Sequence, residues 1–309
     1  MNTAYITHPD CLQHDTGLGH PESIQRLHAI KDRLVTSHLY DFLKHIDAPE
    51  VTDHQLLRVH SSDYLSQVMA EIPAEGHAHL DPDTVVSPDS LKAAYRSAGA
   101  VVKAVDMIMN DECKNAFCAV RPPGHHAETA RAMGFCLFNN IAVGAAHAIS
   151  TYKLEKIAIV DFDVHQGNGT EQIFFNNKRV LFCSTFQHPF YPYTPLYNET
   201  ERMVSVPLEA TAKSEEFRMA VTDHWLPAMD NFQPQMIFIS AGFDAHRDDD
   251  MSGVSLTDDD YRWVTEQLVD VADKYAQGKI VSALEGGYEL HSLARSVEQH
   301  VRTLMELHG

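Results

Sequence analysis

The stretch "IAIVDFDVHQGNG", Ile157–Gly169, begins as an apolar run and ends in polar residues that a protein core would not select. The apolar part has the length and β-branched composition of a strand buried on both faces. Asp161, Asp163 and His165 then follow at intervals of two residues. Burying carboxylates without a partner costs on the order of several kcal/mol. The pattern therefore predicts either that the chain leaves the sheet early or that a positive group lies among these side chains.

Length and composition indicate a folded globular chain. Its 309 residues suffice for one large α/β domain or two ordinary ones, and its content of 44% hydrophobic and 22% charged residues is typical of a soluble protein. Because no repeat, low-complexity tract or flexible linker divides it, we expect a single domain over residues 1–309. No stretch is apolar enough to span a membrane and no signal peptide is visible, so a cytoplasmic location without membrane contact is expected.

Charge and cysteine content narrow the function classes. A formal net charge of −19 argues against direct nucleic-acid binding, which needs clustered Lys and Arg. The five cysteines are an odd number without a C-x-x-C motif, so they are expected to be reduced, buried thiols.

Short apolar runs alternate with helical stretches along the chain. This alternation predicts a three-layer αβα fold, in which helices cover both faces of a mainly parallel sheet. The expected strands are "TAYIT", "AFCAV", "KIAIV", "RVLFCS", "QMIFIS" and "KIVSAL". The expected helices are Glu22–Val35, Ser61–Glu71, Ser90–Met109, Asn139–Thr151, Ser214–Met229, Asp258–Tyr275 and Leu290–Leu307.

Polar clusters follow four of these strands, where ligands collect in such sheets. They are "RPPGHHA" after "AFCAV", "DFDVHQGNG" after "KIAIV", "AGFDAHRDD" after "QMIFIS", and "EGGYE" after "KIVSAL". Taken singly, a His-His pair in a loop, a Gly-Gly turn and an aspartate at a helix cap are ordinary structural features. Four such clusters at one edge of a sheet favour a shared site.

The residue types in these clusters are those of metal-assisted amide hydrolysis. Asp163, His165 and Asp244 supply two carboxylates and one imidazole, a set that suits catalytic zinc and also iron(II) or manganese. His125 and His126 could divide the roles of base and acid, with either assignment open. Tyr288, after two glycines, could stabilise the oxyanion that forms from the substrate carbonyl.

These motifs together resemble the histone deacetylase, acetylpolyamine amidohydrolase and acetoin-utilisation superfamily. The resemblance runs from "GHPES..R" (Gly19–Arg26) through "LLRVHSSDYL", "RPPGHHA", "GFCLFNN", "DFDVHQGNGTEQIF", "STFQHPFYP" and "AGFDAHRDD" to "LEGGY". It implies an arginase-like α/β fold with a narrow acyl-lysine tunnel, and a zinc-dependent deacetylase of a class II-like bacterial type. The implied substrate is an acetylated lysine side chain or an acetylated small amine.

The resemblance also implies roles for individual residues. The single zinc ion would be held by Asp163, His165 and Asp244, with His125, His126 and Tyr288 as catalytic residues. Asp161 would lie behind His125 and Asn168 behind His126, where many class I members have Asp. Because Asn carries no charge, His126 is expected to be less basic and neutral at rest.

Two further sets of residues follow from the same resemblance. Structural potassium is implied at an inner site of Asp161, Asp163, His165, Ser184 and Thr185, and at an outer site of Phe174, Asn177 and Val180. The tunnel wall would include Gly134, Phe135, Gly286, Gly287 and an aromatic residue of "HPFYPY". Met251 occupies the position where polyamine-preferring relatives can carry Glu.

In the segment "EGHAHLDPDTVVSP", either Asp81 or Asp83 could bind a substrate amide or ammonium, or the loop could simply be solvated.

Two other function classes are weaker. A binuclear manganese ureohydrolase typically has Asp two residues after the D-x-H histidine, where this chain has Gly167, so a second metal would lack a bridging ligand. A non-catalytic acyl-lysine binder has no support, since every catalytic position is filled. The substrate choice among acetyl-lysine proteins, acetylpolyamines and other acyl amides stays open, as does a homo-oligomer that meets at the rim loops.

Overall fold

A parallel sheet of eight strands forms the centre of the molecule, of which the computed structural model describes residues 3–194 and 201–306. The strand order is β2-β1-β5-β10-β9-β6-β7-β8, and every pairing between neighbours is parallel. The α/β class with a mainly parallel sheet is therefore confirmed. The strands are β1 Thr3–Thr7, β2 Lys44–Asp47, β5 Asn115–Cys118, β6 Ile157–Asp161, β7 Val180–Gln187, β8 Met203–Leu208, β9 Met236–Ala241 and β10 Ile280–Leu284.

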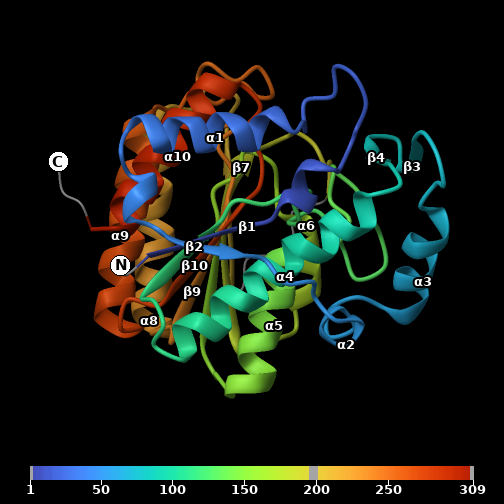
Figure 1. Ribbon diagram of the computed structural model, residues 1–309. Helices are drawn as coiled ribbons and strands as arrows, with labels where there is room; N and C mark the ends of the chain where they lie inside the picture. The colour runs from blue at the N-terminus through green and yellow to red at the C-terminus, as the bar shows by residue number, and fades with distance from the viewer. Residues whose placement is uncertain (1–2, 195–200, 307–309) are drawn as a thin grey trace.

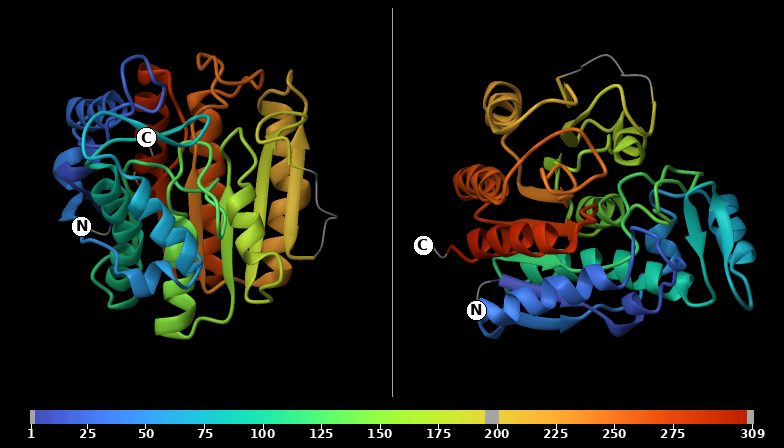
Figure 2. Two further views of the ribbon diagram at one scale, coloured as in Figure 1. Left: turned by 90° about the vertical axis from the view of Figure 1, so that its right-hand side faces the viewer. Right: turned by 90° about the horizontal axis from the view of Figure 1, so that it is seen from above.

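Helices cover the sheet in two layers (Figure 1). α4 and α5 pack against each other and contact the central strands, whereas α1, α9 and α10 pack together on the opposite side. The helices are α1 Gln25–Thr36, α2 Asp53–Leu56, α3 Ser62–Glu71, α4 Ser90–Met109, α5 Asn140–Tyr152, α6 Asn168–Phe174, α7 Ser214–Ala220, α8 Leu226–Phe232, α9 Asp258–Tyr275 and α10 Leu290–Leu304. The antiparallel hairpin of β3 (Ala78–Asp81) and β4 (Thr84–Val86) lies with α3 at one side of the molecule (Figure 2).

The central strands are buried on both faces, which accounts for their continuous apolar sequences. Every residue of β5, β6, β7, β9 and β10 is buried. Large side chains such as Phe117, Phe182 and Phe238 are fully enclosed between the sheet and the helices. Each buried side chain of this size contributes about 1.5–3 kcal/mol relative to an exposed one, so the sheet is a rigid support for the loops that leave it.

The two edge strands were absent from the sequence prediction for identifiable reasons. β2 alternates between half-buried and exposed residues and contains three polar side chains, so it lacks the apolar run of a central strand. β8 contains Pro207, which has no N–H for a sheet ladder. An edge strand tolerates such a residue because one of its sides has no neighbour.

Three helices differ from the prediction by three residues at one end, and the other differences are of a single residue. The first helix begins at Gln25 rather than Glu22, because Glu22 is drawn into the core by two arginines. The helix expected over Ser214–Met229 is α7 and α8 joined by a π-helical turn at Val221–Trp225, and it extends to Phe232. The last helix ends at Leu304, and the expected end at Leu307 lies outside the described residues.

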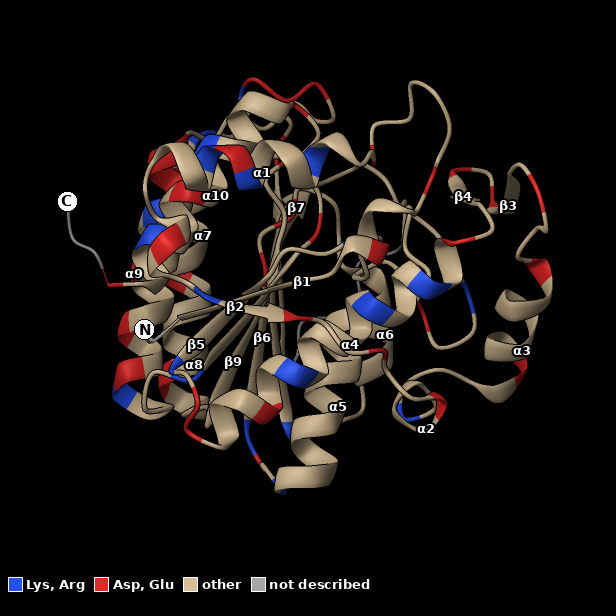
Figure 3. Ribbon diagram, in the orientation of Figure 1, with Lys and Arg blue, Asp and Glu red and all other residues tan. Residues whose placement is uncertain are grey.

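Strand register brings the polar clusters to one edge of the sheet. Asp161 at the end of β6 is paired with Ser240 of β9 and with Ser184 of β7, and Leu284 of β10 is paired with Ala241. The loops after β6, β9 and β10 therefore leave the sheet at the same level. Among them is the acidic loop of residues 248–250, red at the top of Figure 3. Within residues 3–194 and 201–306, no helix has both the length and the apolarity to cross a bilayer.

Candidate metal and active site

Three side chains from two neighbouring strand ends form a group that could hold a metal ion. Asp163 and His165 follow β6, and Asp244 follows β9. Nδ1 of His165 is 3.1 Å from Oδ1 of Asp163 and 3.1 Å from Oδ2 of Asp244. The three possible ligand atoms lie within 4.8 Å of one another and all three residues are buried. The structure thus brings together the three residues expected to bind the metal.

The charges of this group fit a divalent cation. Burial and the Asp163 carboxylate raise the pKa of Asp244 to about 6. Burial alone would lower the pKa of His165, but the carboxylates of Asp244 and Asp163 raise it to about 10. Two buried carboxylates thus share one imidazole, and a bound dication would supply the missing positive charge. Two carboxylate oxygens and one imidazole nitrogen leave coordination positions for other ligands, as catalytic zinc sites require.

Backbone amides orient the two carboxylates. Gly286 N donates to Oδ2 of Asp163 over 2.8 Å, and Val164 N donates to Oδ1 of Asp244 over 3.0 Å. A Cβ on Gly286 would lie 2.2 Å from Asp244 Oδ2 and 2.5 Å from Asp163 Oδ2. Only glycine fits at this position, so the close approach of the loop after β10 is part of the site.

His125 and His126 lie side by side on the loop after β5, with ring centroids 4.0 Å apart. Nδ1 of His125 donates to Oδ2 of Asp161 over 3.0 Å, and Nδ1 of His126 lies 2.8 Å from Oδ1 of Asn168. The edge of the His126 ring faces His165 at a centroid distance of 5.9 Å. The histidine pair is therefore adjacent to the metal-binding group, with Asp161 and Asn168 behind it.

The two histidines differ in charge because their surroundings differ. Burial alone would lower the pKa of His125, but the carboxylates of Asp163 and Asp161 raise it well above its usual range. Burial, together with the positive charges of His125 and His165, lowers the pKa of His126 well below its usual range. At neutral pH the pair of His125 and His126 thus consists of one imidazolium and one neutral imidazole, an arrangement suited to acid and base roles.

Tyr288 is held at the site by contacts to its backbone and its ring. Oδ2 of Asp249 accepts from Tyr288 N over 2.6 Å and from Glu289 N over 3.0 Å. The guanidinium of Arg26 lies 5.0 Å from the centre of the Tyr288 ring and donates to the carbonyl of Gly287 over 2.7 Å. Burial and the Asp244 carboxylate raise the pKa of Tyr288 well above its usual value, so its hydroxyl stays protonated.

Aromatic rings surround the group. The Phe135 ring meets Tyr288 edge-on at 5.8 Å, and the Phe190 ring stacks on His165 at 5.5 Å. Tyr191 meets His126 edge-on at 5.2 Å. Within "HPFYPY", Phe190 and Tyr191 are therefore the residues in contact with the site, a choice that the sequence left open.

Gly134 and Phe135 form a tight turn against His126. Both residues have positive φ angles, +57° and +67°. A Cβ on Gly134 would lie 2.2 Å from Cδ2 of His126, so a larger residue would displace the imidazole. Asp83 supports this turn, since its Oδ1 accepts from Gly134 N over 3.1 Å.

Two other expected residues lie nearby with partners of their own. Asp81 pairs with the exposed Arg131 at 3.3 Å, so its carboxylate is in use within the protein. Met251 is half-buried, and its N–H donates to Oδ1 of Asp249 over 3.1 Å.

The residues expected to bind monovalent cations fall into two groups. Ser184 is on β7 opposite Asp161, and its Oγ is buried with no hydrogen-bond partner among the described residues. An oxygen of this kind fits a cation ligand, because buried hydroxyls otherwise find a partner. Phe174, Asn177 and Val180 form the turn into β7, where the carbonyls of Phe174 and Asn177 accept N–H groups at 2.8 and 3.1 Å.

Several supporting residues lacked a recognised role in the sequence. Oε2 of Glu285 accepts from Gly124 N over 2.6 Å and from His125 N over 3.1 Å, and burial raises the pKa of this carboxyl to about 7. Glu22 is also fully buried, between Arg26 and Arg121. The sequence places these two glutamates inside the motifs "GHPES..R" and "EGGY". Neither motif predicts which residues the carboxylates contact.

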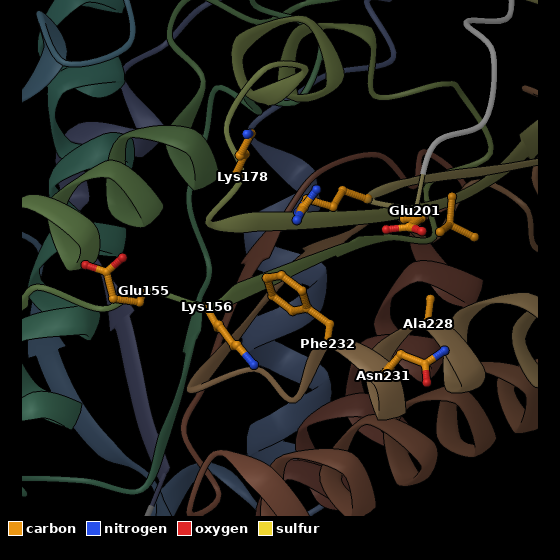
Figure 4. A pocket seen from close by; sticks show the side chains of 9 residues that line it. Glu155, Lys156, Lys178, Glu201, Ala228, Asn231 and Phe232 are labelled. Carbon is orange, nitrogen blue, oxygen red and sulfur yellow. The ribbon is translucent and has the colours of Figure 1, made fainter.

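A cavity of about 680 Å³ lies at the opposite edge of the sheet, before β6, β7 and β8. Lys156, Lys178 and Phe232 are among the side chains that line it (Figure 4). Its lining contains charged groups of both signs and none of the metal-binding or histidine residues. The chemistry of the strand ends is therefore separate from this cavity.

Comparison with known proteins identifies the family. The model of the histone deacetylase domain matches residues 20–304. The chain is 35% identical to a histone deacetylase-like amidohydrolase of Pseudomonas aeruginosa, over 90% of this chain and 74% of that protein. It is 34% identical to type-2 histone deacetylase 2 of Dictyostelium discoideum, over 99% of this chain and 21% of that much longer protein.

A solved structure agrees with these matches. The crystal structure of the HDA15 HD domain superposes with a TM-score of 0.92 at 34% identity, covering 99% of this chain and 90% of that one. The chain therefore belongs to the histone deacetylase family and is a hydrolase of the deacetylase or amidohydrolase kind.

Proposed function

We propose that this protein is a zinc-dependent deacetylase that hydrolyses the amide of N-acetyl-lysine or a similar N-acyl amine. The observation that carries the proposal is the buried group of Asp163, His165 and Asp244 beside two histidines, of which one is positively charged and the other is neutral. Zinc bound there would polarise the amide carbonyl and make a water molecule more acidic.

The two histidines would move the protons. The neutral His126 can accept a proton from the attacking water, since its Nδ1 is occupied by Asn168 and its other ring nitrogen is available. The imidazolium of His125, held by Asp161, can donate a proton to the departing amine. A comparison of the pH–rate profiles of single substitutions at the two positions tests this assignment.

Tyr288 would stabilise the charge that develops on the substrate carbonyl oxygen. Its hydroxyl remains a hydrogen-bond donor because the pKa is raised well above its usual value. Asp249 and Arg26 fix the backbone and the ring from which the hydroxyl extends. A donor held in place before the reaction needs no reorganisation in the transition state, which is the main advantage of such a group.

The walls suit a slender alkyl chain. Phe135, Tyr288, Phe190 and Tyr191 place aromatic rings around the approach to the metal-binding group. Gly134, Gly286 and Gly287 are the expected small residues of the same wall, and Met251 would lie nearer the rim.

We also propose structural potassium at the inner site beside Asp161, Ser184 and Thr185. The unpaired Oγ of Ser184 supports that proposal.

The alternative within the same family is hydrolysis of acetylpolyamines or other small acylated amines. The Pseudomonas relative is named an amidohydrolase, which supports cleavage of an amide bond but does not indicate which substrate carries that bond. The test is acetate release by the zinc-loaded protein from acetyl-lysine peptides and from acetylpolyamines, with Asp244→Asn as the blank. Turnover of either panel that the blank lacks supports the proposal, and silence on both with zinc bound contradicts it.

A further inference from the structure

A chain of two hydrogen bonds continues behind His126, beyond Asn168. Nδ2 of Asn168 donates to Oε1 of Glu128 over 2.8 Å. The same amide nitrogen lies 3.4 Å from Sδ of Met133. On its other side, Oδ1 of Asn168 lies 2.8 Å from Nδ1 of His126. Glu128 is therefore linked to the imidazole through a single neutral side chain.

The direction of this chain is set by the chemistry of its far end. The two ends of an asparagine amide have nearly the same shape, but the oxygen only accepts hydrogen bonds and the nitrogen only donates them. An ionised carboxylate only accepts, and a thioether sulfur is a weak acceptor. Glu128 and Met133 can therefore face only the nitrogen of Asn168. Its oxygen must then face His126.

This direction determines the tautomer of His126. An oxygen facing Nδ1 requires that Nδ1 carry the proton, which leaves the lone pair on Nε2. With an aspartate in place of Asn168 both side-chain oxygens would accept, and no further residue would be needed to choose between them. With asparagine, the choice depends on what the amide nitrogen contacts. Glu128 makes that contact at hydrogen-bond distance.

The backbone holds Glu128 in place for this role. Glu128 N donates to Arg131 O over 2.9 Å, and its carbonyl accepts from Nδ1 of His60 over 3.0 Å. Asn168 begins α6, whose following residues Gly169 and Thr170 donate to the carbonyl of His125 at 3.1 and 3.2 Å. Backbone hydrogen bonds thus hold both the loop that carries the histidines and the start of α6, the two segments that the Glu128–Asn168–His126 hydrogen bonds connect.

We propose that Glu128 is a positioning residue, which fixes the orientation of the Asn168 amide and through it the Nδ1–H tautomer of His126. The inference rests on the proposed function for its effect on turnover, whereas its effect on the tautomer does not. What matters is the hydrogen-bond acceptor at this position. Glutamine can supply an acceptor oxygen, so it should replace glutamate.

The experiment compares Glu128→Gln with Glu128→Leu, and uses Glu75→Leu, at an exposed position, as the matched control. Zinc-loaded proteins labelled with ¹⁵N in histidine report the tautomer by NMR, and a His126→Gln variant assigns the signal. We expect only the Nδ1–H pattern in the unsubstituted protein and in Glu128→Gln, and its loss in Glu128→Leu. Should Glu128→Leu not fold, Glu128→Met removes the strong acceptor with a side chain of similar length.

Kinetics with an acetyl-lysine peptide give the second readout. We expect Glu128→Leu to lower kcat about 10- to 100-fold with KM nearly unchanged, and Glu128→Gln to restore most of that loss. An unchanged tautomer and kcat in Glu128→Leu would overturn the inference. So would a Gln variant as impaired as Leu, because the charge would then be the requirement. If the unsubstituted protein cleaves neither peptides nor polyamines, the proposed function fails, while the NMR comparison still decides the role of Glu128.

Discussion

Zinc binding should displace a proton from His165. In the metal-free protein the carboxylates of Asp244 and Asp163 raise the pKa of His165 to about 10, so Nδ1 is protonated at pH 7. A ligand nitrogen must lose that proton before it binds a metal. The difference between pH 7 and a pKa of about 10 is about three units, and each unit corresponds to about 1.36 kcal/mol. Removing the proton at pH 7 therefore costs about 4 kcal/mol of the zinc-binding free energy.

The sign of the pH dependence follows from the same shift. The pKa of His165 in the folded, metal-free protein is about 10, so protons compete with zinc for its Nδ1 throughout the range below pH 10. Zinc affinity should then rise about tenfold per pH unit between pH 7 and 9. Below pH 6 the slope should approach two protons per zinc, because burial and Asp163 raise the pKa of Asp244 to about 6.

Two measurements check this prediction. Competition with a chromophoric chelator from pH 5.5 to 9 gives the slope of log Kd against pH. Calorimetry in two buffers of different ionisation enthalpy gives the number of protons released per zinc. A slope near zero and no proton release at pH 7–8 would refute the argument, because His165 would then be neutral before zinc binds.

Three other substitutions have expected outcomes. Gly286→Ala places a Cβ 2.2 Å from Oδ2 of Asp244, so zinc affinity should fall about 10- to 100-fold, as measured by zinc content after dialysis, while circular dichroism shows a folded chain. Tyr288→Phe should lower kcat about 10²–10³-fold with a small change in KM in the acetate-release assay, because one carbonyl-stabilising donor is lost. Arg121→Ala removes one of the two arginine partners of the buried Glu22 carboxylate and leaves only Arg26, so it should lower the free energy of unfolding in urea at pH 7 by about 3 kcal/mol, the lower end of the range for breaking a buried ion pair. Burial alone would raise the pKa of Glu22, but Arg121 lowers it to about 2. The ion pair therefore stabilises the folded protein fully above pH 4.5, the usual pKa of this carboxyl, and this stabilisation is lost as the pH falls through 2. The difference in unfolding free energy between the Arg121→Ala and unsubstituted proteins should shrink over that range.

The parallel sheet and the metal-binding group were predictable because both depend on local patterns. Fully buried strands have continuous apolar sequences, and the carboxyl ends of parallel strands meet at one edge. These two rules together predict that Asp163, His165 and Asp244 lie close to one another, as they do in the structure. The edge strands β2 and β8 follow neither rule, since one is polar and the other contains Pro207.

Residues whose roles depend on a partner far away in sequence could not be assigned. Glu128 is 40 residues from Asn168, and Glu285 is 160 residues from His125. A single charge in a loop has no periodicity that indicates what it will contact. The choice of Phe190 and Tyr191 from an aromatic-rich segment likewise depended on backbone geometry that composition does not contain.

The burial of the cysteines determines how the folded protein reacts with thiol reagents. All five thiols are free and buried, and none belongs to the metal-binding group. Burial raises the pKa of Cys118 and Cys183, which lie on central strands, so little reactive thiolate forms. Oxidants and alkylating agents therefore reach no cysteine thiol in the folded chain, and the three residues that would hold the metal include no cysteine. Exposure of these thiols would instead report that the sheet itself has opened.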